Sequence, residues 1–182
     1  MAKVKGTVFG PRLEFIQKKG TPAQQQQVMD LLDPSFRDII ARRVMPHGWY
    51  PFEYYVALNR AIVKVLGHGD EAILREVGYY SANVSLNGIY KTFFRAGTPG
   101  FIVKIATRAW EQYFQNGQLK VETHTAQSLT MHFTGIEVLA REHFISTAGW
   151  IKKVLELSGA KNVKVELGKF GPELVTLEVS WE

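Results

Sequence analysis

Apolar and polar residues follow the clearest pattern in the last third of the chain, residues 117–182. Four segments alternate apolar and polar positions, as strands with one buried face do: 120–124, 129–133, 163–167 and 174–179. Between the second and third segments, apolar residues recur at helical spacing: Phe144, Ala148, Ile151 and Leu155. Gly159 follows as a suitable helix end. This pattern predicts a ββαββ unit with a four-stranded antiparallel sheet.

Residues 11–116 instead carry the apolar spacing of helices, which are predicted near 11–19, 22–32, 35–44, 51–66, 70–94 and 99–116. Three of the helix starts place a capping side chain before a proline: Thr21-Pro22, Asp33-Pro34 and Thr98-Pro99. The side-chain oxygen accepts a hydrogen bond from an unpaired backbone N–H, and proline lacks the N–H that would have no partner. The predicted fold is therefore α+β, a single domain over 1–182 with a helical N-terminal layer (1–116) and the ββαββ unit (117–182).

Two of these helices contain residues that need an explanation. The helix at 51–66 is apolar on both sides, which predicts a central position, and Asn59 inside its apolar stripe would need a hydrogen-bond partner. The helix at 70–94 carries a stripe of small residues: Gly78, Ser81, Ala82, Ser85 and Gly88. Such a stripe allows close approach by a neighbouring helix, which is the commoner reason, or by a ligand.

Composition limits the kinds of protein that the chain can be. With 182 residues, 46% of them hydrophobic, it can bury a sizeable core. The absence of cysteine excludes disulfides, thiol nucleophiles and cysteine-ligated metals. No apolar run is long enough to span a bilayer, and the N-terminal residues lack the apolar segment of a secretory signal. We therefore expect a cytoplasmic protein without a membrane segment.

No motif for catalysis is present. The sequence contains no nucleophile elbow, phosphate-binding loop or dinucleotide fingerprint, so no catalytic residue is predicted and an enzyme is not expected. Glu122, His124 and His132 fall on the polar faces of two adjacent strands, with Glu122 and His132 as candidate cross-strand neighbours. A metal would need about three converging ligands. Strand alternation alone places polar residues on this face, so no metal site is predicted.

Aromatic residues are dense along the helices at 70–94 and 99–116. Such residues usually form core, but aromatic-lined cavities also hold apolar or planar ligands. The best candidate site is a pocket between these two helices and the sheet. Five aromatic residues are predicted to contact a ligand there: Tyr90, Phe94, Phe101, Trp110 and Tyr113.

Several segments resemble known families. Residues 4–10 resemble the start of the heme-based nitric-oxide/oxygen-binding (H-NOX) domains. Residues 51–78 are more similar to a family of uncharacterised paralogues abundant in myxobacteria, on Gly67-His68-Gly69-Asp70 and Arg75-Glu76-Val77-Gly78, and residues 159–181 agree with that resemblance. The vinyl-reductase-like (4VR) small-molecule-binding domains share the general architecture. The resemblance covers most of the chain and implies a sensor-like scaffold in a bacterial protein.

The chain departs from the heme-binding relatives at both heme contacts. Those relatives place an axial histidine on the helix before the sheet and hold the propionates with a Tyr-x-Ser-x-Arg motif. Here Ala109 and Trp110 stand where the histidine is expected, no histidine occurs in 99–116, and the motif is missing from the chain. A large aromatic residue at this position would fill a heme cavity. The resemblance therefore implies an H-NOX-like scaffold without heme, and no other cofactor is predicted.

Three functions are compatible with these features. The leading one is a non-catalytic sensory or regulatory domain that binds a small apolar or planar ligand or a protein partner and responds by a shift of its helices. The second is an interaction or homodimerisation module with candidate exposed anchors Trp49, Tyr50 and Trp181. The third is a binder of nucleic acid or an anionic nucleotide through basic residues: Arg37, Arg42, Arg43, Lys91 and Arg95. A net charge of only +5, with acids and bases interleaved, disfavours nucleic acid.

Overall fold

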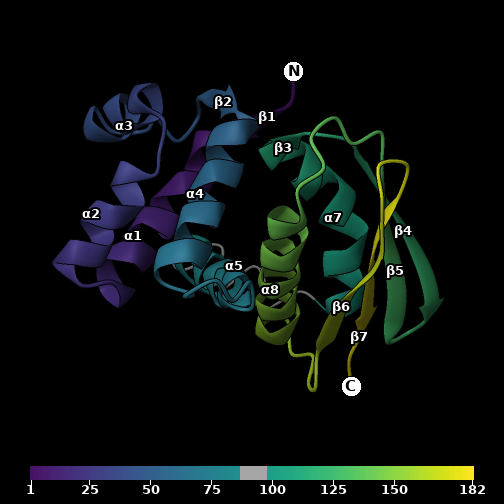
Figure 1. The fold of residues 1–182 in the computed structure, drawn as a ribbon. Helices are drawn as coiled ribbons and strands as arrows, with labels where there is room; N and C mark the ends of the chain where they lie inside the picture. Colours follow the sequence, from purple (N-terminus) through teal and green to yellow (C-terminus); the bar gives the residue numbers. More distant parts are fainter. Residues whose placement is uncertain (87–97) are drawn as a thin grey trace.

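The computed structural model describes residues 1–86 and 98–182, and its helices agree with the sequence pattern (Figure 1). The described helices are α1 (Phe9–Lys19), α2 (Pro22–Asp30), α3 (Pro34–Ala41), α4 (Phe52–Val65), α5 (Ile73–Ser85), α7 (Pro99–Tyr113) and α8 (Arg141–Leu157), with a 3-10 turn η1 (Gly6–Val8) before α1. The helix predicted over 70–94 is confirmed as far as Ser85, and residues 87–97 lie outside the described part of the chain. No described helix has both the length and the apolar content needed to cross a membrane.

Three helix starts confirm the predicted capping. In each, a side-chain oxygen accepts a hydrogen bond from a backbone N–H of the first turn: Thr21 from Gln24, Asp33 from Ser35, and Thr98 from Phe101. The side chain of Gln24 also accepts from the backbone of Thr21, which completes a capping box. Pro51 differs from the prediction, because it is the N-cap of α4 and not its first residue.

The C-terminal unit has the predicted ββαββ order. Its strands are β4 (Gln118–Thr125), β5 (Ser128–Thr134), β6 (Lys164–Phe170) and β7 (Val175–Ser180), all antiparallel to their neighbours in the order β4-β5-β7-β6. Helices α7 and α8 cover one face of this main sheet (Figure 1). Buried side chains such as Phe133 and Leu177 point toward these helices. Helix α8 ends before Gly159, which adopts the left-handed backbone that glycine favours (φ +98°).

A second, small sheet was not predicted. It joins β1 (Lys3–Lys5), β2 (Trp49–Pro51) and β3 (Phe114–Gln115) in the order β2-β1-β3. Helix α7 therefore ends at Tyr113, whereas the sequence pattern extended it to 116. Strands this short contain too few residues for alternation to be visible, and they form only because the fold brings three distant segments together.

The apolar core consists of two clusters. One lies between the main sheet, α7 and α8 and includes Phe133 and Phe144. The other lies among α1 to α4 and includes Phe9, Phe52 and Tyr55. Helix α4 is mostly buried, as predicted for a central helix. Helix α5 joins the two clusters, because it packs closely against α8 and also contacts α1 and α4 (Figure 1).

Candidate functional site

A cavity of about 140 Å³ lies where α7, α8 and the inner face of the main sheet meet. Most of its wall is apolar and includes Ala106, Ala109 and Trp110 of α7 with Met131 and Phe133 of β5. An apolar cavity of about 150 Å³ in another protein stays dry and binds benzene. The cavity therefore has the size and wall chemistry to hold one ring-sized apolar group.

The rest of the wall is polar and comes mainly from the N-terminal helices and α8. Its polar members include Arg12 of α1, Tyr55 of α4, Ser81 of α5 and Ser146 of α8. Arg12 is only 5% exposed. It lies one helical turn after Phe9 and one turn before Ile16, both buried, so the face of α1 that enters the core carries Arg12 with it.

Uncharged groups bind the guanidinium of Arg12. Its Nε donates to Asn59 Oδ1 at 3.1 Å, and its Nη1 donates to the Val8 carbonyl at 2.9 Å. Its Nη2 donates to the Tyr55 hydroxyl at 2.7 Å and to Ser146 Oγ at 2.8 Å. No ion pair among the described residues includes Arg12. Burial lowers the pKa of Arg12 below its ordinary value, although Tyr55 opposes the shift, and the group stays protonated.

His143 of α8 extends this network. Its Nδ1 lies 3.3 Å from the Tyr55 hydroxyl. Burial, and secondarily the positive charge of Arg12, lower the pKa of His143 to about 3, so the ring is neutral at pH 7. We assign Nδ1 as the acceptor, because the Tyr55 oxygen already accepts from Arg12 and has its proton to donate. Two buried nitrogens find no hydrogen-bond partner within the described residues, His143 Nε2 and Asn59 Nδ2.

A close crossing of α5 and α8 holds Ser146 beside Arg12. A Cβ atom at Gly78 would overlap the carbonyl oxygen of Ser146, and Gly149 of α8 meets the backbone of α5 in the same way. Only glycine allows the two backbones to approach so closely. The small-residue stripe of α5 therefore serves helix packing at Gly78, as expected. Two serines of the same stripe also line the cavity: Ser81 and Ser85.

The five predicted contact residues are placed differently from one another. Trp110 and Tyr113 line the cavity. Phe101 lies in the first turn of α7, is 39% exposed and does not belong to the cavity wall. The other two predicted contacts, Tyr90 and Phe94, lie outside the described residues. Three further residues named in the sequence analysis also lie there: Gly88, Lys91 and Arg95.

Trp110 both lines the cavity and packs against the ring of His143. Its ring centre lies 4.7 Å from that of Phe114, 4.8 Å from that of Phe133 and 5.2 Å from that of His143. Its indole nitrogen donates to the carbonyl of Gly117 at 3.2 Å. With 6% of its surface exposed, Trp110 is held by these three rings and this hydrogen bond.

Several solved structures with a similar fold are H-NOX proteins. The Fe(II) unliganded H-NOX protein from K. algicida has a TM-score of 0.74 at 16% identity, over 98% of this chain and 96% of that chain. A mutant H-NOX protein from S. oneidensis in the Fe(II) ligation state has a TM-score of 0.72 at 9% identity, over 98% and 96%. An oxygen-binding H-NOX domain related to soluble guanylate cyclases, as its oxygen complex, has a TM-score of 0.63 at 12% identity, over 98% and 95%. This chain has an H-NOX-like fold.

At these identities the likeness establishes the fold alone. No protein-family model matches the chain, and no curated protein matches it in sequence. In this H-NOX-like fold α7 is the helix that precedes the main sheet, which is the element where the sequence resemblance expects an axial histidine. Ala106, Ala109 and Trp110 occupy its cavity side.

The histidines predicted on the outer face of the H-NOX-like sheet are paired diagonally. Glu122 lies opposite Thr130 in register, and His132 lies opposite Lys120, so the direct pairing of Glu122 with His132 is wrong. His132 Nε2 still reaches Glu122 Oε2 at 3.0 Å. His124 Nε2 contacts Thr130 Oγ1 at 2.8 Å instead. The described residues contain no group of three or more His, Asp or Glu side chains placed to hold a metal ion.

The predicted surface anchors are largely buried. Trp181 is 8% exposed and packs in the core cluster of the main sheet, so its prediction as an exposed anchor is wrong. It continues the alternation of β7 and lies on the same face as Leu177 and Val179. Trp49 and Tyr50 are half-buried in β2. The described basic candidates are exposed on and just after α3: Arg37, Arg42 and Arg43.

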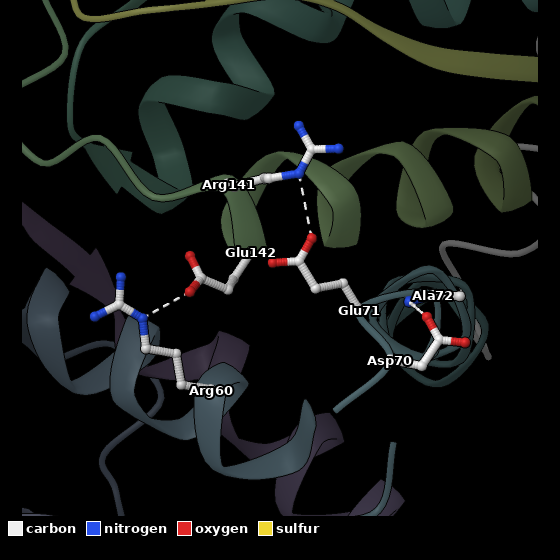
Figure 2. A network of polar contacts seen from close by, with 6 residues as sticks. All are labelled: Arg60, Asp70, Glu71, Ala72, Arg141 and Glu142. Atoms are coloured by element: carbon white, nitrogen blue, oxygen red, sulfur yellow. Dashed lines mark hydrogen bonds and ion pairs between the residues drawn. The ribbon is translucent and has the colours of Figure 1, made fainter. Parts of the chain in front are cut away.

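A separate polar cluster lies at the surface, where α8 begins (Figure 2). Glu142 of α8 accepts from Arg60 Nε of α4 at 2.6 Å. The adjacent Arg141 pairs with Glu71, just before α5, at 3.2 Å. Asp70 caps the same turn by accepting from the backbone N–H of Ala72. These ion pairs tie α8 to α4 and to the start of α5.

Arg12 and His143 carry no motif in the sequence and were missed as site residues. The spacing of Arg12 from Phe9 and Ile16 is the one available signal, since helical periodicity places it on an apolar face. Asn59 gave a second signal, because it was predicted to need a hydrogen-bond partner. Arg12 is the partner of its Oδ1, and its Nδ2 has none among the described residues. For His143 no comparable signal exists, because its ring packs against residues of α4, α7 and β3, which are distant in the sequence.

Proposed function

We propose that this chain is a non-catalytic sensory domain of the bacterial cytoplasm that binds a small ligand without heme. The cavity of about 140 Å³ behind α7 is the observation that carries the proposal, because it is apolar over most of its wall and polar at Arg12. The H-NOX-like fold supports it, since one structural neighbour is described as oxygen-binding. Trp110 and Tyr113 remain proposed ligand contacts.

Heme does not fit the residues present. Several structural neighbours are described with Fe(II) or heme. At the place on α7 where the resemblance expects the axial histidine, the chain carries Ala109 and Trp110, neither of which offers a lone pair to iron. The fixed indole of Trp110 fills space next to the cavity, and the remaining volume suits one ring. A porphyrin, built from four pyrrole rings around iron, is far larger.

The position of the cavity supports a signalling mechanism. The wall of the cavity comes from α1, α4, α5, α7, α8 and the main sheet, and so from elements of both apolar clusters. A ligand shifts a conformational equilibrium only when it binds one arrangement more tightly than another. A ligand that contacts both clusters would bind with different affinity to two arrangements in which the N-terminal helices are placed differently relative to the sheet.

The other candidate functions have less support. Burial of Trp181 removes one of the three anchors of an interaction module. The exposed basic residues around α3 are accompanied by Asp33 and Asp38, which weakens an anion-binding face. Membership of the family of uncharacterised paralogues is compatible with the proposal and adds no ligand chemistry.

Thermal unfolding with apolar probes tests the proposal. Benzene or toluene at ten times its Kd should stabilise the protein by about 1.4 kcal/mol and raise Tm by about 4 °C. Ala106→Leu should abolish this shift, because its side chain fills the cavity. Ala126→Leu, on the exposed turn after β4, is the matched control and should keep it.

Two results would overturn the proposal. One is a wild-type Tm that no ring-sized probe changes, whether the probe is neutral or anionic. The other is an absorbance titration with heme that gives a stoichiometric complex, which Ala126→Leu retains and Ala106→Leu loses. The expected titration shows no stoichiometric heme complex in any of the three proteins.

A further inference from the structure

Arg12 places a full positive charge in the interior of the protein. A buried charge without a counter-ion is among the most unfavourable groups that a fold can contain. No described carboxylate pairs with Arg12, and residues 87–97 contain no Asp or Glu. Its four hydrogen bonds supply dipoles but no negative charge. The site therefore has the charge to take an anion.

Two hydrogen-bond donors remain for such an anion. A guanidinium has five N–H groups, and the four bonds of Arg12 leave one on Nη1 without a partner among the described residues. The hydroxyl of Ser146 accepts from Nη2 and keeps its own O–H to donate. A carboxylate, with two oxygens held in one plane, is suited to accept from two neighbouring donors.

The side of the cavity away from Arg12 indicates the chemistry of the rest of the ligand. Ala106, Ala109 and Met131 offer no charge and no strong hydrogen-bond donor, so this side favours an apolar group. We propose that the cavity binds a small organic carboxylate, with its carboxylate at Arg12 and Ser146 and its apolar body between α7 and the main sheet. This inference rests on the proposed function, since it names the ligand class of the same cavity.

The volume of the cavity and the single charge of Arg12 narrow the class of ligand further. A volume of about 140 Å³ admits an apolar body of about one six-membered ring. One guanidinium balances one negative charge, so a monoanion fits better than a dianion such as phosphate. Because Arg12 is only 5% exposed, we expect the preference for the anion to depend little on ionic strength.

Benzoate and benzamide test the inference, because they have nearly the same shape and differ in charge. Isothermal titration of the full chain at pH 7 should give a Kd for benzoate at least about tenfold below that for benzamide. Arg12→Met should bring the two Kd values to about the same value. Arg60→Met, which removes an arginine from the surface of α4, is the matched control and should retain the difference. Ser146→Ala should reduce the ratio about threefold and serves if Arg12→Met fails to fold.

The outcomes separate this inference from the proposed function. If benzamide or toluene binds and benzoate has no advantage, the carboxylate assignment is wrong and the cavity still binds ligands. An advantage for benzoate that survives both Arg12→Met and Ser146→Ala would place the anion elsewhere and also overturn it. If none of the three probes binds, both proposals fail.

Discussion

At the surface of the molecule Arg60 and Arg141 each face a carboxylate, whereas the buried Arg12 faces only neutral groups. Both polar clusters join α8 to the N-terminal helices. The surface cluster uses two ion pairs, to Glu142 and Glu71 (Figure 2). The buried cluster uses hydroxyl, amide and carbonyl groups and leaves two nitrogens without a partner in the described residues.

This difference separates stability from function. Exposed ion pairs contribute about 0–1 kcal/mol each and are sufficient to position α8. A buried cation without an anion opposes folding, and stability alone does not explain it. Sites where buried polar or charged groups lack partners are often functional sites. The buried cluster is therefore the better place to look for a ligand, and the surface cluster is a tie between helices.

The largest expected effect is that of Tyr55→Phe. This change removes the hydroxyl that accepts from Arg12 and contacts His143, so two buried groups lose a partner. We expect the free energy of unfolding to fall by about 2 kcal/mol, measured by urea unfolding. Tyr54→Phe, one residue earlier in α4, has no such bond within the described residues and should change it by less than about 0.5 kcal/mol. Equal effects of the two changes would contradict the role of the buried cluster.

The next effect depends on pH, through the imidazole of His143. Burial and the charge of Arg12 lower its pKa to about 3, against an ordinary value of about 6.5 in the unfolded chain. Between these values only the unfolded chain binds the proton, so stability falls as pH falls, by about 1.4 kcal/mol per pH unit, and above pH 6.5 there is no contribution. His143→Phe should remove this slope, as urea unfolding at pH 7, 6 and 5 would measure. A difference between variant and wild type that stays constant over this range would contradict the burial of a neutral imidazole.

The smallest effect is expected at the surface cluster. Glu142→Gln removes the charge that pairs with Arg60 and that favours the N-terminus of α8. The free energy of unfolding should fall by at most about 1 kcal/mol in low salt and by less in 1 M salt, because exposed charges are screened. Glu71→Gln, in the more exposed pair, should have a still smaller effect. If Glu142→Gln lowered the free energy of unfolding by more than Tyr55→Phe does, the surface cluster would matter more for stability than the buried cluster, contrary to this comparison.

The sequence anticipated much of the buried cluster's surroundings and little of the cluster. The stripe on α4 marked Asn59 as a residue in need of a partner, and the stripe on α5 marked the close crossing at Gly78. Trp110 and Tyr113 were placed near a cavity because aromatic residues were dense there. Arg12 and His143 were not, since each meets its side-chain partners across 43 or more positions of the chain.

By itself, the sequence determined the periodic part of this protein. Alternation defined the four strands of the main sheet, and helical spacing and proline caps defined the helices. The H-NOX-like architecture was implied by the resemblance of segments such as residues 4–10, and the fold agrees with it. These signals are local, because a strand or helix buries one face whatever it packs against. Only the tertiary structure decided the small sheet, the burial of Trp181 and the position of Arg12 beside the cavity. Each depends on which distant groups become neighbours when the two apolar clusters form. Burial then places Arg12 beside the cavity without a carboxylate partner among the described residues.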